Sequence, residues 1–240
     1  MDLSKLKVFV DFDGTITSID VGEAIFREFG DADKVQAIVD DLLHGKITAR
    51  KCWDLLFSTI ERIDRNSFDN FINSMQVDST FPNFYYYCIE NKIDLFILSD
   101  GFDYYIQKIL QRQGLNHIRI FANHLIIDEN SRLIPSYPYF DIECDTSANC
   151  KRNHILSNSG DEDFTIYIGD GNSDKYSIEY CDFIFAKNDL LKYCDKKRIT
   201  YFQFNNFEYI IQRLEEFKLK KRLKKRYQAE LKRQEAFKYE

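Results

Sequence analysis

The sequence has few residues that interrupt regular structure, and it has no long apolar segment. Only three of its 240 residues are proline, and we find neither an internal repeat nor a low-complexity linker. No stretch approaches the roughly 18 apolar residues that a membrane-spanning helix needs, and the apolar run at residues 8–10 is far too short for a secretory signal. Six cysteines without such a signal indicate a reducing compartment. We therefore expect a cytoplasmic protein without a membrane span.

The charge is distributed unevenly along the chain. Residues 208–240 carry 11 Lys and Arg against 6 acidic residues, whereas residues 1–207 carry 22 against 33. Nucleic-acid backbones are held mainly by clustered Lys and Arg, so the acidic body predicts no nucleic-acid partner. For the tail we predict a long, basic C-terminal helix from Glu208. It is a solvated helix face or, alternatively, a surface for RNA, an acidic partner or a membrane.

Three apolar runs each end in small and acidic residues. The runs cover residues 7–10, 93–98 and 164–168, and they lead into Asp-Phe-Asp-Gly-Thr, Ser-Asp-Gly and Gly-Asp-Gly-Asn-Ser-Asp. Buried strands of a parallel sheet look like this when the loops at their carboxyl ends carry chemistry. With a fourth short run at 183–185, the pattern predicts an α/β fold, a Rossmann-like parallel sheet flanked by helices.

The residues between the first two predicted strands have helical periodicity. Apolar residues recur at helical spacing in 21–29, 33–43 and 48–60, and Thr48 suits the N-cap of the third helix. This is too much helix for a single crossover between strands. We therefore expect an inserted helical cap at 17–88, a catalytic core at 1–16 and 89–207, and the basic C-terminal helix at 208–240. Residues 121–140 are expected to form a hairpin or flap.

Two carboxylates at alternate positions follow the first predicted strand. In an extended segment Asp11 and Asp13 lean the same way, so one can attack a phosphorus atom while the other exchanges a proton. Gly14 lets the backbone approach an anion closely. The alternative interpretation is an acidic loop that aids solubility.

A hydroxyl and an ammonium group follow later elements. Ser99 and Gly101 precede a predicted helix from Asp103, and their hydroxyl and backbone N–H groups suit a phosphate oxygen. Lys151, at the head of a predicted helix running to Ser157, can neutralise the phosphoryl oxygens and the carboxylate pair. Taken alone, the serine is a simple helix cap and the lysine a surface residue.

The third predicted strand leads into Gly169-Asp170-Gly171-Asn172-Ser173-Asp174. Mg²⁺ prefers oxygen ligands and keeps several waters, so one or two carboxylates here together with Asp11 suit a magnesium site. The segment begins like a dinucleotide-binding fingerprint. Asp174 stands in the place of the third glycine, however, and its charge would repel a pyrophosphate, which excludes that interpretation.

Four elements have now been described: the segment 11–15, Ser99 with Gly101, Lys151, and the segment 169–174. Their order, their placement after strands and their residue types together resemble the haloacid dehalogenase superfamily of phosphohydrolases, over residues 7 to about 204. The resemblance implies an Mg²⁺-dependent phosphatase with an aspartyl-phosphate intermediate. In it Asp11 is the nucleophile, Asp13 the general acid/base, and Ser99 and Lys151 the phosphate clamps. Metal ligands would be Asp11, the Asp13 carbonyl, Asp170 and, in support, Asp174; substrate-binding residues would be Asp20, Gly101 and Asn172.

The helical insert resembles the branch with phosphoserine phosphatases and the methionine-salvage 2-hydroxy-3-keto-5-methylthiopentenyl-1-phosphate phosphatase. Asp20 stands where phosphoserine phosphatases usually have glutamate, and Leu56 lies near the place of their carboxylate-binding arginine, although Arg50 is one to two turns away. These details favour a methionine-salvage-type substrate over phosphoserine. The cysteines at 144 and 150 are expected to be unligated rather than half a zinc site. Their cluster just before Lys151 resembles that of the methionine-salvage group, and equally that of phosphoethanolamine/phosphocholine phosphatases.

Other classes of function stay open at this point. The scaffold can serve as a catalytically silent binding protein, although the intact set of five catalytic residues argues against this. A phosphotransferase or mutase with the same intermediate is a further alternative. We expect the partner to be a small phosphorylated metabolite, and the sequence does not indicate which one, nor the oligomeric state or the role of the tail.

Overall fold

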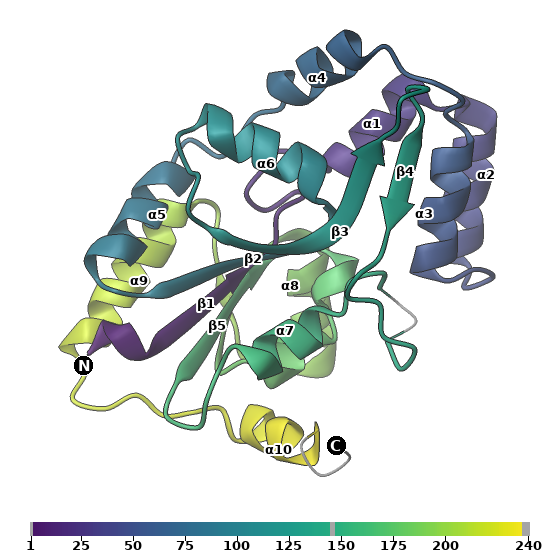
Figure 1. The fold of residues 1–240 in the computed structure, drawn as a ribbon. Coiled ribbons are helices and arrows are strands. Elements are labelled where there is room, and N and C mark those ends of the chain that lie inside the picture. The colour runs from purple at the N-terminus through teal and green to yellow at the C-terminus, as the bar shows by residue number, and fades with distance from the viewer. Residues whose placement is uncertain (1, 145–146, 237–240) are drawn as a thin grey trace.

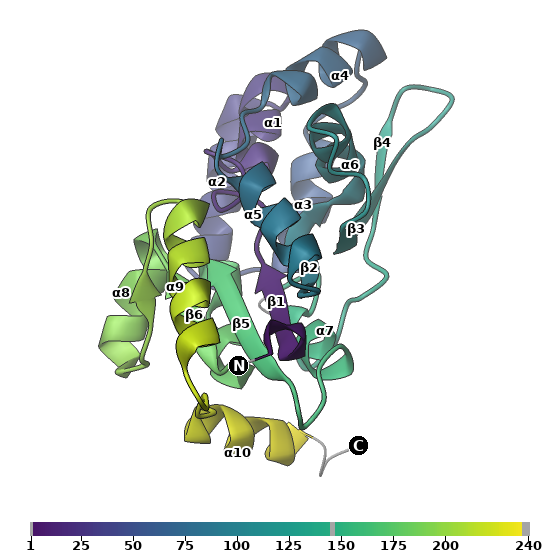
Figure 2. The ribbon, with the colours of Figure 1, turned by 90° about the vertical axis from the view of Figure 1, so that its left-hand side faces the viewer.

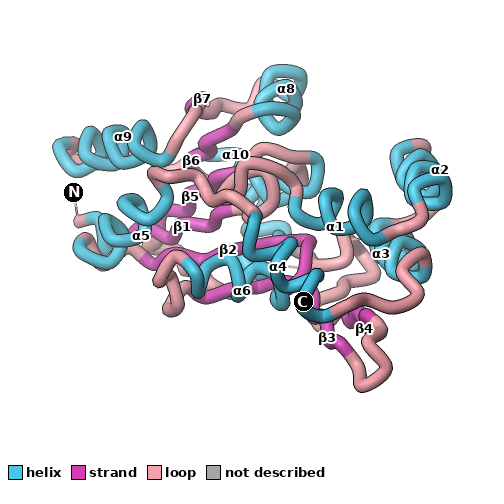
Figure 3. The backbone as a smooth tube through the Cα atoms, turned by 90° about the horizontal axis from the view of Figure 1, so that it is seen from above, coloured by secondary structure: helices cyan, strands magenta, loops and turns pink. Residues whose placement is uncertain are grey.

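A seven-stranded sheet runs through the centre of the computed structural model, which describes residues 2–144 and 147–236 (Figure 1). The strand order is β4-β3-β2-β1-β5-β6-β7, as the view from above shows (Figure 3), and only the β3–β4 pair is antiparallel. This confirms the predicted α/β fold with a parallel sheet. The strands are β1 Leu6–Val10, β2 Asp94–Phe102, β3 Arg119–Ile127, β4 Leu133–Ser136, β5 Phe164–Gly169, β6 Phe183–Ala186 and β7 Phe202–Gln203.

Helices cover both faces of the sheet, and successive side chains of a strand point to opposite faces. In β1, Val8 and Val10 belong to one apolar cluster and Phe9 belongs to a second cluster on the other face. The first cluster includes side chains of three helices, α5 Phe81–Glu90, α6 Asp103–Arg112 and α9 Phe207–Leu219. The second includes side chains of α7 Lys151–Ser157 and α8 Asn188–Lys197. Helices on both faces leave the strand ends as the place for chemistry.

Four helices lie beyond the carboxyl end of β1 (Figures 1 and 2). They are α1 Val21–Phe29, α2 Ala32–Leu43, α3 Ala49–Ser58 and α4 Arg65–Ser74. The side chain before each helix accepts a hydrogen bond from a backbone N–H in the first turn. Thr48 caps α3 in this way, as the sequence predicted. The helical character of this insert is thereby confirmed.

The predicted hairpin at 121–140 is present as β3 and β4. The carboxylate of Asp128 closes its turn by accepting hydrogen bonds from the backbone N–H groups of Asn130 and Arg132. Strand β3 also pairs in parallel with β2 and so extends the main sheet, which the sequence did not predict. The hairpin projects from that sheet beside α3, which β4 contacts (Figure 1).

The prediction of one long helix from Glu208 is wrong. Helix α9 ends at Leu219, an irregular segment follows, and a second helix, α10 Tyr227–Ala236, lies at the opposite end of the molecule from α1–α4 (Figure 2). Seven basic residues within 218–226 would repel one another at helical spacing. The break also brings Arg226 and Arg233 onto the core, where both donate to backbone carbonyls of the segment 178–181.

Three short 3₁₀ turns complete the described elements: Leu3–Lys5, Asn172–Asp174 and Ser177–Tyr180. The predicted end of the cap at residue 88 falls inside helix α5. This helix packs against α9 and β2. Within 2–144 and 147–236, every helix is too short or too polar to cross a membrane.

Candidate active site

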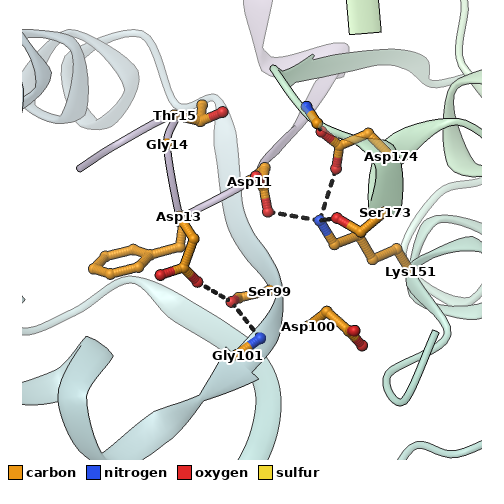
Figure 4. Close-up of polar contacts among 12 residues, drawn as sticks. Asp11, Asp13, Gly14, Thr15, Ser99, Asp100, Gly101, Lys151, Ser173 and Asp174 are labelled. Carbon is orange, nitrogen blue, oxygen red and sulfur yellow. Dashed lines mark hydrogen bonds and ion pairs between the residues drawn. The ribbon is translucent and has the colours of Figure 1, made fainter. Parts of the chain in front are cut away.

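The carboxyl ends of β1 and β5, the last residues of strand β2 and the start of α7 meet at one edge of the sheet (Figure 4). Asp11 follows β1 directly, and its backbone N–H donates to the carbonyl of Ile168 near the end of β5. Parallel pairing of β1 with β2 and β5 thus brings together residues that are about 90 and 160 positions apart in the sequence. The predicted catalytic and metal-binding residues gather here: Asp11, Asp13, Ser99, Lys151, Asp170 and Asp174.

A buried lysine joins two of the carboxylates. The Nζ of Lys151 lies 2.6 Å from Oδ1 of Asp11 and 2.7 Å from Oδ1 of Asp174, and it also donates to the Ser173 hydroxyl. Its side chain is only 1% exposed. Because such a charge is costly to bury without partners, the lysine can lie here only alongside acidic groups. It is therefore placed to contact any anion bound next to Asp11.

Three carboxylates form a group that can hold a metal ion. Oxygen atoms of Asp11, Asp170 and Asp174 all lie within 4.8 Å of one another. Thr15 donates to Oδ1 of Asp170, and the backbone N–H groups of Asp170 and Gly171 donate to Oδ2 of Asp174. These hydrogen bonds fix the carboxylates in place although they repel each other, and hard oxygen donors suit a hard divalent cation.

The electrostatics of this group favour a bound cation. Burial and the neighbouring Asp174 raise the pKa of Asp11 well above its ordinary value, against the opposing effect of Lys151. Burial and Asp174 also raise the pKa of Asp170. For Lys151, burial lowers the pKa, but Asp11 and Asp174 outweigh it and raise the pKa. A cation among the carboxylates would lower their pKa values and keep Asp11 ionised.

Asp13 occupies a different environment from Asp11. Its Oδ1 accepts the backbone N–H of Val21, and its Oδ2 accepts the hydroxyls of Ser99 at 3.0 Å and Tyr105 at 2.9 Å. Burial raises the pKa of Asp13 to about 7, with a contribution from the negative charge of Asp20 and against the effect of these hydrogen bonds. A carboxyl with such a pKa can give up and take back a proton near neutral pH.

Two glycines allow close approaches at this edge. Gly14 has a φ of +73°, and a Cβ there would lie 2.7 Å from an oxygen of Asp170. At Gly101 a Cβ would collide with the Tyr105 hydroxyl and lie 2.8 Å from Oδ2 of Asp13. The backbone N–H of Gly101 donates to the Ser99 hydroxyl, which orients that hydroxyl towards Asp13. Gly101 thus lies at this edge of the sheet, and substrate binding by its backbone stays a prediction.

The other two predicted substrate-binding residues lie at its margin. Asp20 is exposed and caps α1 by accepting the backbone N–H of Glu23. Asn172 begins the 3₁₀ turn that carries Asp174, and its side chain is exposed. Substrate binding by these two residues stays a prediction.

Several residues of the site were not predicted. Tyr105 donates to Asp13, Tyr167 donates to Asp174, and Asn188 donates to Asp170. Lys187 is partly buried beside Thr15, and burial lowers its pKa despite the nearby charges of Asp170, Asp78 and Asp11. Lys187 follows strand β6 directly, so the pattern of polar residues after apolar runs would have indicated it. The tyrosines carry no such signal because their spacing also suits core packing.

Comparison with known proteins adds independent findings. A sequence model of the family described as Putative Phosphatase matches residues 6–225. The 2-hydroxy-3-keto-5-methylthiopentenyl-1-phosphate phosphatase of Bacillus mycoides (strain KBAB4) is 28% identical over 216 residues, which are 87% of this chain and 95% of the relative.

Solved structures with a similar fold include a HAD family hydrolase from Salmonella enterica serovar Typhi, with a TM-score of 0.69 and 17% identity over 86% of this chain and 70% of that one. A substrate-bound phosphoserine phosphatase has a TM-score of 0.65 and 19% identity over 87% of this chain and 97% of its own. At these identities the structures establish the common fold.

Proposed function

The chain belongs to the family described as Putative Phosphatase and is a phosphatase of the haloacid dehalogenase type, and we propose that it hydrolyses small phosphomonoesters through an aspartyl phosphate on Asp11. One observation carries the proposal. Lys151 contacts Asp11 and Asp174 at 2.6 and 2.7 Å within a group of three carboxylates. An ammonium group and a metal site beside one carboxylate are what phosphoryl transfer to that carboxylate requires.

In the first step Asp11 attacks the phosphorus atom and forms a new P–O bond, while the bond to the leaving oxygen breaks. Lys151 holds Oδ1 of Asp11, so the other oxygen of that carboxylate can face the phosphorus atom. Asp13 gives its proton to the leaving oxygen, a role that a pKa of about 7 suits. Ser99 and Lys151 donate hydrogen bonds to the phosphoryl oxygens and thereby stabilise their charge.

In the second step a water molecule attacks the same phosphorus atom. The carboxylate of Asp13 takes a proton from that water, the bond between phosphorus and Asp11 breaks, and inorganic phosphate leaves. Asp13 then carries the proton for the next cycle. The hydrogen bonds of Asp13 to Val21 and Tyr105 keep its carboxyl group near Asp11, while the Ser99 hydroxyl, which donates to Asp13 in the free protein, turns to the phosphoryl group.

Mg²⁺ is the cofactor that this donor set fits. We propose that carboxylates of Asp11 and Asp170, with Asp174 in support and the backbone carbonyl of Asp13, hold it. When bound, Mg²⁺ offsets negative charge on the phosphoryl group and the carboxylates.

For the substrate we propose a methionine-salvage-type phosphate, following the name of the Bacillus relative. Leu56, near the place expected for a carboxylate-binding arginine, is buried in the apolar core. The guanidinium of Arg50 lies 5.4 Å from the ring of Tyr137 and 4.9 Å from that of Phe140. Both observations weaken the case for phosphoserine, which remains the alternative with phosphoethanolamine and phosphocholine.

The predicted division into a catalytic core at 1–16 and 89–207 and a cap at 17–88, which contains α1–α4, is also part of the proposal. A cytoplasmic location likewise stays a prediction, which the free state of all six cysteines supports.

The covalent intermediate can be tested with p-nitrophenyl phosphate, whose leaving group needs little protonation. In Asp13→Asn the nucleophile remains but water activation is lost, an effect of about 10²- to 10⁴-fold. Phosphoenzyme should therefore accumulate after a short pulse, and intact-mass analysis after an acid quench should find one phosphoryl group on Asp11. Asp11→Asn is the control and should carry none. An unlabelled Asp13→Asn protein together with turnover by Asp11→Asn would exclude the covalent route.

The substrate proposal needs a separate measurement. A panel of phosphorylated metabolites should give a higher kcat/KM for the methylthiopentenyl phosphate than for phosphoserine. Phosphoserine at the top of the panel would reverse the choice of substrate, and no hydrolysis of any member would favour a silent binding protein.

A further inference from the structure

Asp100 lies between Ser99 and Gly101 but faces away from the phosphate site. In Figure 4 its carboxylate points away from Asp11 and Asp13, so the residue is not placed to contact a phosphoryl group. Its Oδ1 instead accepts three hydrogen bonds of 2.8 Å from the segment 147–149, namely from the Ser147 hydroxyl and from two consecutive backbone N–H groups. Three donors on one oxygen mark a residue that organises a turn.

That turn leads directly into the phosphate clamp. Residue 149 is followed by Cys150, the N-cap of α7, and by Lys151, the first residue of the helix. The position of the turn therefore determines where α7 begins and from which direction the lysine side chain reaches Asp11. A turn held by short hydrogen bonds to a partly buried carboxylate is rigid, which is what a clamp for a transition state requires.

The same two segments are joined by further contacts. The side-chain amide of Asn149, which is fully buried, donates to the backbone carbonyls of Ser99 and Phe121. Asn123 of β3 donates to the backbone carbonyl of Asp100 at 2.6 Å. The end of β2 is thus fixed on one side by β3 and on the other by the turn before α7, so Ser99 and Lys151 are held in one unit.

We propose that Asp100 is a positioning residue that sets the place of Lys151 relative to Asp11 by holding the turn at 147–149. The inference rests on the proposed function, since it concerns the proposed clamp Lys151. A carboxylate suits this role better than a neutral residue because charge-assisted hydrogen bonds to backbone N–H groups are roughly twice as strong.

The test compares kcat and the inhibition constant of inorganic phosphate in Asp100→Ala and Asp100→Asn, with p-nitrophenyl phosphate as substrate. Alanine removes the acceptor, and a displacement of about 1 Å in a positioning contact costs about 10²-fold, so kcat should fall by about that factor and phosphate should bind more weakly. Asparagine keeps one oxygen for the three donors but loses the charge, so it should restore part of the rate. Equal losses in both variants would contradict the proposed role.

Asp103→Ala is the matched control. Asp103 lies at the start of α6, and its carboxylate accepts the backbone N–H of Leu125 and lies 2.6 Å from His124, so it holds β3 and not α7. Its removal should leave kcat and phosphate binding unchanged. If Asp103→Ala and Asp100→Ala behave alike, the effect is a general loss of structure and the proposal is wrong.

A double-mutant cycle decides whether Asp100 acts through Lys151. In a Lys151→Met background, Asp100→Ala should cost little more, because the group that it positions is gone. An undiminished cost there would show that Asp100 acts by another route.

The single variants separate this inference from the proposed function. If Lys151→Met itself keeps full activity, the proposed function fails. If Lys151→Met is impaired while Asp100→Ala is fully active, only this inference is rejected. Should Asp100→Ala not fold, Ser147→Ala, which removes one donor, should give a smaller loss of kcat, and no loss would overturn the proposal.

Discussion

Strand β5 has a cluster of buried charges at each end, and the two clusters differ in their balance of charge. Near the start of the strand, Asp182 accepts the backbone N–H and the hydroxyl of Thr165 and forms an ion pair of 3.0 Å with Arg233. Beyond its other end, Asp11, Asp170 and Asp174 lie close together, and Lys151 contacts two of the three.

The difference separates charges that stabilise the fold from charges that perform chemistry. In the first cluster, called here the Asp182 cluster, each charged group has a partner of opposite sign or backbone groups to bind. In the second, the carboxylates raise each other's pKa values, as at Asp11 and Asp170. Such an excess of like charge destabilises the folded chain and is retained where a ligand compensates it.

The largest expected effect comes from exchanging one carboxylate for an amide in each cluster. Asp11→Asn should lower kcat by about 10⁴-fold or more, because an amide is too weak a nucleophile to form the acyl phosphate. Asp182→Asn should leave kcat unchanged and lower the melting temperature. Steady-state assays below the transition and thermal unfolding measure both. A loss of kcat in Asp182→Asn comparable with that of Asp11→Asn would mean that the two clusters are not distinct in function.

The second-largest effect should come from removal of the metal, which should affect the group of Asp11, Asp170 and Asp174 but not the Asp182 cluster. With EDTA, activity should fall by roughly 10³-fold, since a metal supplies several kcal/mol of transition-state stabilisation, and Mg²⁺ should restore it. Mg²⁺ should also raise the melting temperature of the wild type, because it binds the folded chain. In Asp170→Asn that increase should shrink, whereas in Asp182→Asn it should persist. Full turnover in metal-free buffer would refute the magnesium site.

Much of the active edge was predictable because the signal is local. Asp11, Ser99 and Asp170 each follow an apolar run, and a parallel sheet places the carboxyl ends of its strands at one edge. The order of residues therefore determined which side chains meet. Lys151 could be placed only through the family resemblance, since a lysine at the start of a helix is usually a surface residue.

The remainder depends on contacts that the sequence pattern does not encode. Asp100 finds its donors 47 to 49 residues later, and Asp182 pairs with an arginine 51 residues away. The basic tail looked like a single solvated helix because the carbonyls that bind Arg226 lie 45 to 48 residues earlier in the sequence, outside any local pattern. Long-range hydrogen bonds override local propensity in both places.

The ion pair of the Asp182 cluster gives a third, smaller effect. Arg233→Ala leaves Asp182 buried with one partner fewer, and breaking a buried pair in this way should lower the free energy of unfolding by about 3 kcal/mol. Arg222→Ala, an exposed arginine of the same tail, is the control and should change it by less than about 0.5 kcal/mol. Urea titration measures both. Equal stabilities of the two variants would show that the tail arginine contributes nothing to the fold.

The smallest expected effect is the pH dependence of stability that Asp13 causes. In the folded chain its pKa is raised to about 7, whereas an unfolded Asp titrates near 3.8. Between these values the folded state binds the proton more tightly, so the stability from this group is complete at pH below 3.8 and is lost as the pH rises through about 7. From pH 6 to pH 8 the loss should amount to about 1.4 kcal/mol.

Urea titrations of the wild type and of Asp13→Asn, in EDTA so that no cation offsets the charge, isolate this contribution. The free energy of unfolding of the wild type should fall from pH 6 to pH 8 more steeply than that of Asp13→Asn, which has no carboxyl at this position. The Arg233→Ala protein should keep the wild-type slope, since the Asp182 cluster lies at the other end of β5. Parallel slopes in the wild type and Asp13→Asn would mean that Asp13 ionises at its ordinary pKa. In that case it would be a carboxylate at neutral pH, unable to protonate a leaving oxygen. Asp13 would then not share the raised pKa of Asp11 and Asp170 beyond the carboxyl end of β5.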